Sequence, residues 1–176
     1  TPAVLNQIGI DGFSPLHHAV LAAVNPRIVS LLISCGADIG QRSNDTLGGT
    51  ALHMAAQTLN REMVDVLVRS ADGRASLLDA TSSYGHTSLQ MAVQVDVSGE
   101  MVRLLLDSGV SKESINPDTG DTALHYAARF GNVAAAVELV RRGVDTDAVN
   151  FYGASAAQVA VWHGHGHTIL SALSAG

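Results

Sequence analysis

Apolar side chains along this chain follow a helical pattern that returns at a regular interval. In one run they occupy positions 63, 64, 67 and 68, and the same spacing returns within residues 101–106 and 135–140. Residues spaced in this way share one face of an α-helix. Gly109 and Gly143 follow the last two runs, where a left-handed residue caps a helix end. The pattern therefore predicts a series of amphipathic helices, with glycine as the cap.

A second motif precedes each apolar run and predicts a further helix. It reads Gly-x-Ser/Thr-x-Leu-His/Gln-x-Ala, and its copies begin at glycines 36, 37, 35 and 33 residues apart. The copies occupy residues 12–19, 48–55, 85–92, 120–127 and 153–160, the last being the loosest. Ser or Thr in the third position suits a helix N-cap, and Pro15 suits a first helical turn. Each repeat is therefore expected to hold two helices.

This motif and its period resemble the ankyrin repeat, whose period is about 33 residues. The resemblance extends from about residue 10 to residue 173. It implies an all-α solenoid of about five helix-turn-helix repeats, with β-hairpin-like fingers and stability that comes from stacking. The predicted repeats form a single domain and span residues 10–43, 44–82, 83–117, 118–150 and 151–176. The extra residues of the longer repeats, such as 72–76, are expected in loops.

Composition and charge restrict the function. With 47% apolar and 15% charged residues, the 176-residue chain is neither disordered nor a charged tail. The net charge is −6 and the ten basic residues are scattered, so direct nucleic-acid binding is not expected, whereas a basic protein segment would be attracted. The chain does not begin with Met, and we expect it to be a piece of a longer protein.

Cysteine content and hydropathy bear on the compartment. Cys35 is the only cysteine, which excludes an internal disulfide and fits the cytoplasm or nucleus. No apolar run approaches the roughly 18 residues that a membrane span requires. We therefore expect a protein that does not engage a membrane. We also expect it to be a monomer.

Histidines are the candidate residues for catalysis or metal binding, but their pattern favours a structural role. His17, His53 and His125 occupy one repeated position, whereas catalysis needs different groups at one place. The resemblance implies that these rings bond to neighbouring backbone. Residues 163–167 alternate His and Gly, but His165 falls at the repeat's usual Gly-His turn, without a nearby carboxylate or cysteine. We therefore predict no catalytic residue, no metal site and no cofactor.

Aromatic residues indicate a binding surface. Ankyrin geometry implies that residues flanking each leading glycine lie on a finger, and that the end of each first helix faces a groove. Six of the seven aromatic residues fall at such positions: Phe13, Tyr84, Phe130, Phe151, Tyr152 and Trp162. Exposed aromatic side chains are enriched at interface hot spots, so these rings and the adjacent His163 are predicted to contact a partner. The alternative is that some rings only support the fingers or cover the end of the stack.

Acidic residues gather near the same predicted groove. Asp118 and Asp121 flank one finger glycine, and Arg129 lies at the end of the following helix. With the aromatic rings, they predict an amphipathic groove for a peptide that carries Lys or Arg. The alternative is a solvated acidic finger.

A second resemblance concerns the partner. Residues 77–89 and 31–38 are similar to segments of the inhibitor-of-NF-κB family. That similarity implies binding to a Rel-type transcription-factor dimer, masking its basic nuclear-localisation segment or modulating its DNA binding. The chain departs from that family in lacking a phosphodegron serine pair and in having Gln158 where His is usual. The alternatives are a peptide-motif reader, with Trp162, Tyr152 and Phe130 as an aromatic cage, and an adaptor domain of a larger signalling protein or enzyme.

Overall fold

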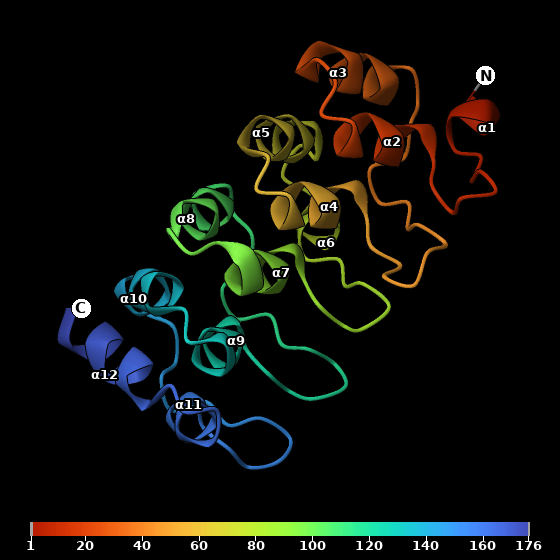
Figure 1. Cartoon of the computed structure of the whole chain (residues 1–176). Coiled ribbons are helices and arrows are strands. Elements are labelled where there is room, and N and C mark those ends of the chain that lie inside the picture. Colours follow the sequence, from red (N-terminus) through yellow and green to blue (C-terminus); the bar gives the residue numbers. More distant parts are fainter. Residues whose placement is uncertain (1, 176) are drawn as a thin grey trace.

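Two parallel rows of helices form the molecule, and loops project from one side of the inner row (Figure 1). The computed structural model describes residues 2–175, without the side chains at positions 2, 3, 173 and 175, so the predicted fifth repeat ends one residue beyond it. The inner row consists of α2 (Pro15–Leu21), α4 (Ala51–Gln57), α7 (Ser88–Val95), α9 (Ala123–Phe130) and α11 (Ala156–Trp162). The outer row consists of α3 (Pro26–Ser34), α5 (Arg61–Ser70), α8 (Glu100–Asp107), α10 (Val133–Arg141) and α12 (Gly166–Ala175). Each helix contacts its partner in the other row and its neighbour in its own row, which confirms the all-α solenoid.

The inner helices begin where the sequence predicts, because a Ser or Thr precedes each of them. In the third repeat, the Gln90 backbone N–H donates to Thr87 Oγ1 at 3.2 Å, and the Thr87 N–H donates to Gln90 Oε1 at 3.0 Å. Capping boxes of this kind precede all five inner helices. They satisfy backbone donors that the first turn leaves without a partner. Pro15 is the first residue of α2, as predicted.

Small side chains let the two rows approach closely. Ala55, Ala92, Ala127 and Ala160, all at the last position of the repeated motif, are fully buried. Leu52, Leu89 and Leu124, which come from three successive inner helices, are buried in the same hydrophobic core. A fully buried leucine stabilises a fold by about 1.5–3 kcal/mol, so this repeated layer supplies much of the cohesion between repeats.

The fingers are tied to one another through the backbone. The Asn44 N–H donates to the Gly12 carbonyl at 2.7 Å, and the Phe151 N–H donates to the Thr119 carbonyl at 2.9 Å. Gly120 stands at a finger tip with φ of +73°, and a Cβ there would lie 2.8 Å from the Phe151 backbone nitrogen. The hairpin-like fingers therefore form one continuous face beside the inner helices (Figure 1).

Two short helices lie outside the two rows. The prediction of a loop at residues 72–76 is partly wrong, because Ala75 and Ser76 form the start of α6 (Ala75–Leu78). Leu78 is 5% exposed, and its burial gives this segment a reason to form a helical turn. α1 (Pro2–Leu5) precedes Asn6, whose amide oxygen accepts from the Asp38 N–H at 2.8 Å and so ties the first residues to the end of the first repeat.

The helices of residues 2–175 are all too short or too polar to span a lipid bilayer.

Candidate protein-binding face

Five of the six aromatic rings predicted to contact a partner lie at the surface. Tyr84, Phe151 and Tyr152 stand on the fingers, and Phe130 and Trp162 are the last residues of α9 and α11. Between 47% and 74% of the surface of each is exposed, Phe130 having the least and Tyr152 the most. Several large aromatic rings that are exposed to water on neighbouring repeats mark a surface suited to burial by another molecule.

The sixth ring, Phe13, is less exposed than the other five, because it is half-buried and packs against the core. Its ring meets His18 edge-on, with centroids 5.7 Å apart. Phe151 also has a supporting contact, because a Cβ on Gly120 would come within 2.6 Å of its ring. These contacts agree with the structural alternative for Phe13 and Phe151, although most of Phe151 remains accessible.

The structure corrects the prediction for Asp121. Its carboxylate is fully buried, with Oδ2 lying 2.7 Å from Arg129 Nη2 and Oδ1 accepting from Asn150 Nδ2 at 2.8 Å. A buried carboxylate needs such partners, since its desolvation is otherwise costly. Asp121 therefore cannot touch a partner, and it neutralises the cation of Arg129. Asp118 on the same finger is exposed.

The Arg129–Asp121 pair belongs to a polar and aromatic cluster that joins repeats three and four. The Arg129 guanidinium lies 5.4 Å from the centre of the Tyr126 ring, and the His86 and Tyr126 rings meet edge-on with centroids 5.2 Å apart. Tyr126 Oη accepts from Asn116 Nδ2 at 3.0 Å. The sequence analysis did not single out Tyr126, although it is an aromatic residue inside the repeated motif.

Burial determines the charge of this cluster. Desolvation lowers the pKa of His86, and the nearby cation of Arg129 lowers it further. Desolvation also raises the pKa of Tyr126. Both rings are therefore neutral at physiological pH, and with Arg129 paired to Asp121 the cluster carries little net charge.

An apolar hollow of about 500 Å³ lies between the turns of repeats three and four. Val95, Val97, Phe130 and Val133 line it. Val97 is 86% exposed, and the sequence analysis did not identify it as a candidate.

Two of the three repeated histidines, His53 and His125, bond to the next finger as predicted, whereas His17 accepts from the Ser14 N–H at 3.2 Å and its Nε2 is buried without a hydrogen-bond partner among the described residues. His53 Nε2 lies 2.9 Å from the His86 carbonyl of the next finger, and His125 Nε2 lies 2.9 Å from that of Ala154. His163 Nδ1 bonds to the Val159 carbonyl at 2.9 Å, so one edge of this exposed ring is held by its own helix. His165 Nδ1 bonds to the Arg129 carbonyl at 3.0 Å. Within the described residues, no three His, Cys, Asp or Glu side chains converge as metal ligands would.

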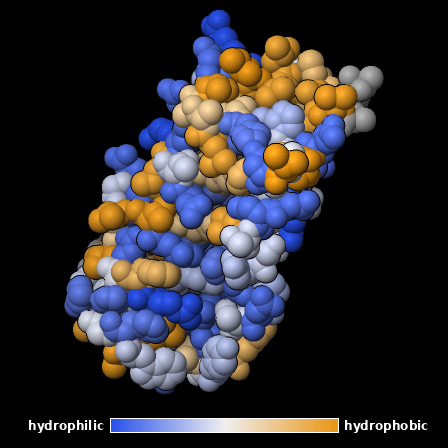
Figure 2. Space-filling model, turned by 45° about the vertical axis from the view of Figure 1, so that its right-hand side comes forward, coloured by the Kyte–Doolittle hydropathy of each residue, from blue (hydrophilic) through white to orange (hydrophobic). Residues whose placement is uncertain are grey.

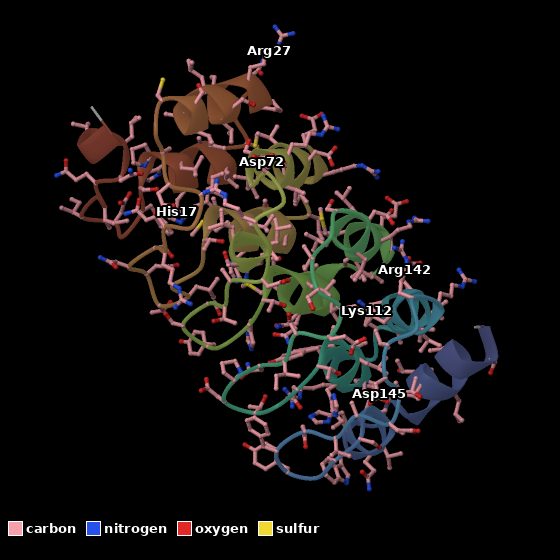
Figure 3. The ribbon with its side chains drawn as sticks, turned by 180° about the vertical axis from the view of Figure 1, so that it is seen from behind. His17, Arg27, Asp72, Lys112, Arg142 and Asp145 are labelled. Atoms are coloured by element: carbon pink, nitrogen blue, oxygen red, sulfur yellow. The ribbon has the colours of Figure 1, made fainter. Side chains whose placement is uncertain are left out.

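The outer row differs in character from the finger side. Arg142 pairs with Asp107 and Glu138, and Lys112 Nζ donates to the Arg142 and Gly143 carbonyls (Figure 3). Arg27, also on the outer row, extends away from the stack.

In the view of Figure 2, the most hydrophobic patches gather at the end formed by the first repeats. The large aromatic rings instead concentrate on the fingers and inner-helix ends of repeats three to five.

The repeated helix pairs, capping boxes and fingers define a helical-repeat solenoid. Residues 16–116 and 89–175 match the family model described as ankyrin repeats (3 copies), and the chain belongs to the ankyrin-repeat family. Members of this family act as protein-interaction modules and are generally not enzymes.

Curated relatives place such repeats in larger proteins. The chain is 35% identical to neurogenic locus notch homolog protein 1 of Danio rerio over 145 residues, 82% of this chain and 6% of that protein. It is 29% identical to the nuclear factor NF-kappa-B p105 subunit of Gallus gallus over 161 residues, 91% of this chain and 16% of that protein. It is also 29% identical to the B-cell lymphoma 3 protein homolog of Mus musculus over 143 residues, 81% of this chain and 31% of that protein. The chain thus spans only a small part of these relatives, and an NF-κB subunit among them agrees with the resemblance read from residues 77–89.

Proposed function

We propose that this chain binds a partner protein through the fingers and inner-helix ends of repeats three to five, and that it catalyses no reaction. The observation that carries this proposal is the exposure of Tyr84 and Tyr152 on the fingers and of Phe130 and Trp162 at the ends of α9 and α11. Tyr and Trp bury a large area on binding at a small cost in rotamer entropy, so they are the natural anchors of the contact.

We further propose that the partner is a Rel-type transcription-factor dimer, held through a basic segment. The net charge of −6 and exposed Asp118 favour a basic ligand, and an NF-κB subunit is among the relatives. Binding would mask a nuclear-localisation segment or alter DNA binding by the dimer, in the cytoplasm or the nucleus. The chain itself needs no contact with nucleic acid for this role.

Affinity measurements with a purified Rel-homology dimer test the proposal. Trp162→Ala is expected to weaken binding at least tenfold, because a hot-spot ring contributes about 2 kcal/mol. Leu31→Ala is the matched control, since Leu31 is similarly exposed at 62% but lies on outer helix α3. Equal binding by the two variants would place the contact elsewhere on the surface. No binding by the unmodified chain at micromolar concentration would exclude the Rel-type partner.

A second candidate is an adaptor domain of a larger signalling protein. The coverage of only 6% and 16% of two relatives favours it, because in those proteins the matching repeats accompany much longer sequences. This function predicts that the chain binds a segment of another protein without Rel homology, while Trp162→Ala remains damaging. The same variants therefore separate the two candidates.

A further inference from the structure

The first repeat leaves exposed two outer-helix positions that the other repeats bury. In α3 they are Ile28, with 48% of its surface exposed, and Leu32, which is half-buried. The equivalents of Ile28 in the later outer helices are at most 5% exposed: Met63, Met101, Ala135 and Thr168. The equivalents of Leu32 are at most 1% exposed: Leu67, Leu105, Leu139 and Ala172. This difference agrees with the hydrophobic patches seen at this end of the molecule in Figure 2.

The preceding repeat, and not the following one, covers these positions. In the last repeat, Thr168 and Ala172 are fully buried, although within residues 2–175 no helix follows α12. Their cover therefore comes from helices earlier in the chain. α3 has its own inner partner, α2, but it is the first outer helix of the described residues. Ile28 and Leu32 are accordingly exposed because no outer helix of residues 2–175 stands on that side of α3.

Residues 2–6 repeat the arrangement of residues 75–79. α1 and α6 are both four-residue helices, and each is followed directly by a polar side chain that bonds to the backbone of the next repeat. Asn6 Oδ1 accepts from the Asp38 N–H at 2.8 Å, 32 residues later in the chain. Asp79 Oδ1 accepts from the Ser111 N–H at the same distance and with the same separation in the chain. A short helix before a finger thus occurs twice, in the same relation to the repeat that follows.

The chain also continues from both short helices in the same way. The Gly9 N–H donates to the Phe13 carbonyl at 2.8 Å, which closes the first finger. The Ser82 N–H donates to the His86 carbonyl at the same distance in the third repeat. α6 is reached from outer helix α5 through residues 71–74. By this correspondence, the chain upstream of α1 is expected to be an outer helix that lies beside α3.

The inner row is polar at the same end of the stack. The fourth residue of α2 is His18, whose Nε2 lies 2.8 Å from Asp11 Oδ2, and about half of each side chain is exposed. At this position the other inner helices carry residues that are at most 5% exposed: Met54, Met91, Tyr126 and Val159. An inner helix laid over α2 would take the His18–Asp11 pair out of water, which is costly unless new polar partners replace the water. An apolar cover is therefore favoured over α3 but not over α2.

We propose that the segment of the longer protein immediately upstream of residue 1 forms one amphipathic helix, which packs on α3 and closes the outer row without an inner helix of its own. Its length should resemble that of α5, α8 and α10, which have 10, 8 and 9 residues. Its apolar residues should show the spacing i, i+1, i+4 and i+5 of the other outer helices and contact Ile28 and Leu32. The inference does not depend on the proposed partner, because it concerns the end of the stack opposite repeats three to five.

Hydrogen–deuterium exchange in two chains tests this: residues 1–176, and the natural protein beginning one repeat length, roughly 33 residues, earlier. The α3 amides should exchange at least tenfold more slowly in the longer chain, because a packed helix suppresses local opening of the end repeat. Ile28→Glu should abolish this slowing. In residues 1–176 the same change should leave the exchange and the far-UV circular dichroism unchanged, since Ile28 is already half-exposed. Ser30→Glu is the matched control, because Ser30 is exposed in the same helix and its equivalents Asp65 and Arg103 are charged.

Equal exchange of α3 in the two chains overturns the inference. Slowing that grows with protein concentration also overturns it, because a second copy would then cover this face. Labelling with diethyl pyrocarbonate, read by mass spectrometry, distinguishes one helix from a full repeat: His18 should react equally in both chains. Protection of His18 in the longer chain would show that an inner helix covers α2 as well, and the single closing helix would be wrong. None of these measurements involves a partner, so the proposed function is tested separately.

Discussion

Replacing His53 by glutamine should remove a defined part of the acid sensitivity of this fold. The His53 ring is 1% exposed, and the backbone N–H of Thr50 donates to its Nδ1 at 3.1 Å. Nε2 therefore carries the proton and donates to the His86 carbonyl at 2.9 Å. Protonation of Nδ1 would point its N–H at the N–H of Thr50 and break the bond between them, so the folded chain favours the neutral ring.

Burial is the main reason that the pKa of His53 falls from 6.5 to about 4, and it outweighs the opposing bond to the His86 carbonyl. The unfolded chain takes up a proton near pH 6.5, whereas the folded chain resists until near pH 4. The stability from neutral His53 is thus fully present above pH 6.5 and is lost as the pH falls from 6.5 to 4. Linkage gives a loss of about 2 kcal/mol at pH 5 and about 3 kcal/mol below pH 4.

The chain contains its own control for this substitution. Gln90 occupies the equivalent position in the third repeat, where its Oε1 accepts from Thr87 and its Nε2 donates to the Asp121 carbonyl at 3.1 Å. Glutamine can therefore make both bonds of the imidazole without titrating. His53→Gln should change the free energy of unfolding little at pH 7.5.

Urea unfolding, followed by circular dichroism at pH 7.5 and pH 5.0, measures the difference. The unmodified chain should lose about 2 kcal/mol more than His53→Gln between these two values. Burial also lowers the pKa of His17 and His86, but both residues are present in both proteins, so their contributions cancel. Equal losses in the two proteins would refute the assignment of a buried neutral ring.

Two further substitutions test contacts between repeats, with the free energy of unfolding in urea as the readout. Asp121→Ala should lower it by about 3 kcal/mol, because Arg129 and Asn150 lose a buried partner; an unchanged value would show that the pair contributes nothing. Asn132→Ala should lower it by about 2 kcal/mol, because the side chain caps α10 and donates to the Val93 and Asp96 carbonyls at 2.8 and 2.9 Å; a loss no larger than a surface substitution would contradict this.

Features with local causes could be predicted from the sequence. A Ser or Thr followed three residues later by His or Gln specifies where an inner helix begins, since both bonds of the capping box lie within one turn. Glycine at the end of an apolar run likewise specifies where an outer helix stops. The position of α6 could not be predicted in this way, because the burial of Leu78 depends on packing against other repeats.

The error at Asp121 has a general reason. Asp121 directly follows a finger glycine, a position expected to be exposed in every repeat. In the structure this position is occupied by Phe13, Gly49, His86, Asp121 and Ala154, and all of them are buried or half-buried. The residue after the glycine therefore turns toward the next repeat. For Asp121 the partners that permit burial, Arg129 and Asn150, come from the end of α9 and from the following finger, so no local pattern reveals them.

The positions that can recognise a partner are those whose side chains do not bond to a neighbouring repeat. The third residue of each inner helix bonds to the next finger in repeats two, three and four, and only His and Gln serve there. The last residue of each inner helix makes no such bond. It is the seventh residue in α2, α4 and α11 (Leu21, Gln57 and Trp162) and the eighth in α7 and α9 (Val95 and Phe130). A substitution at the third position acts first on stability, whereas one at the last position acts first on binding. Exposed side chains that differ between otherwise equivalent repeats are therefore the ones that can specify a partner, and in this chain they concentrate in repeats three to five.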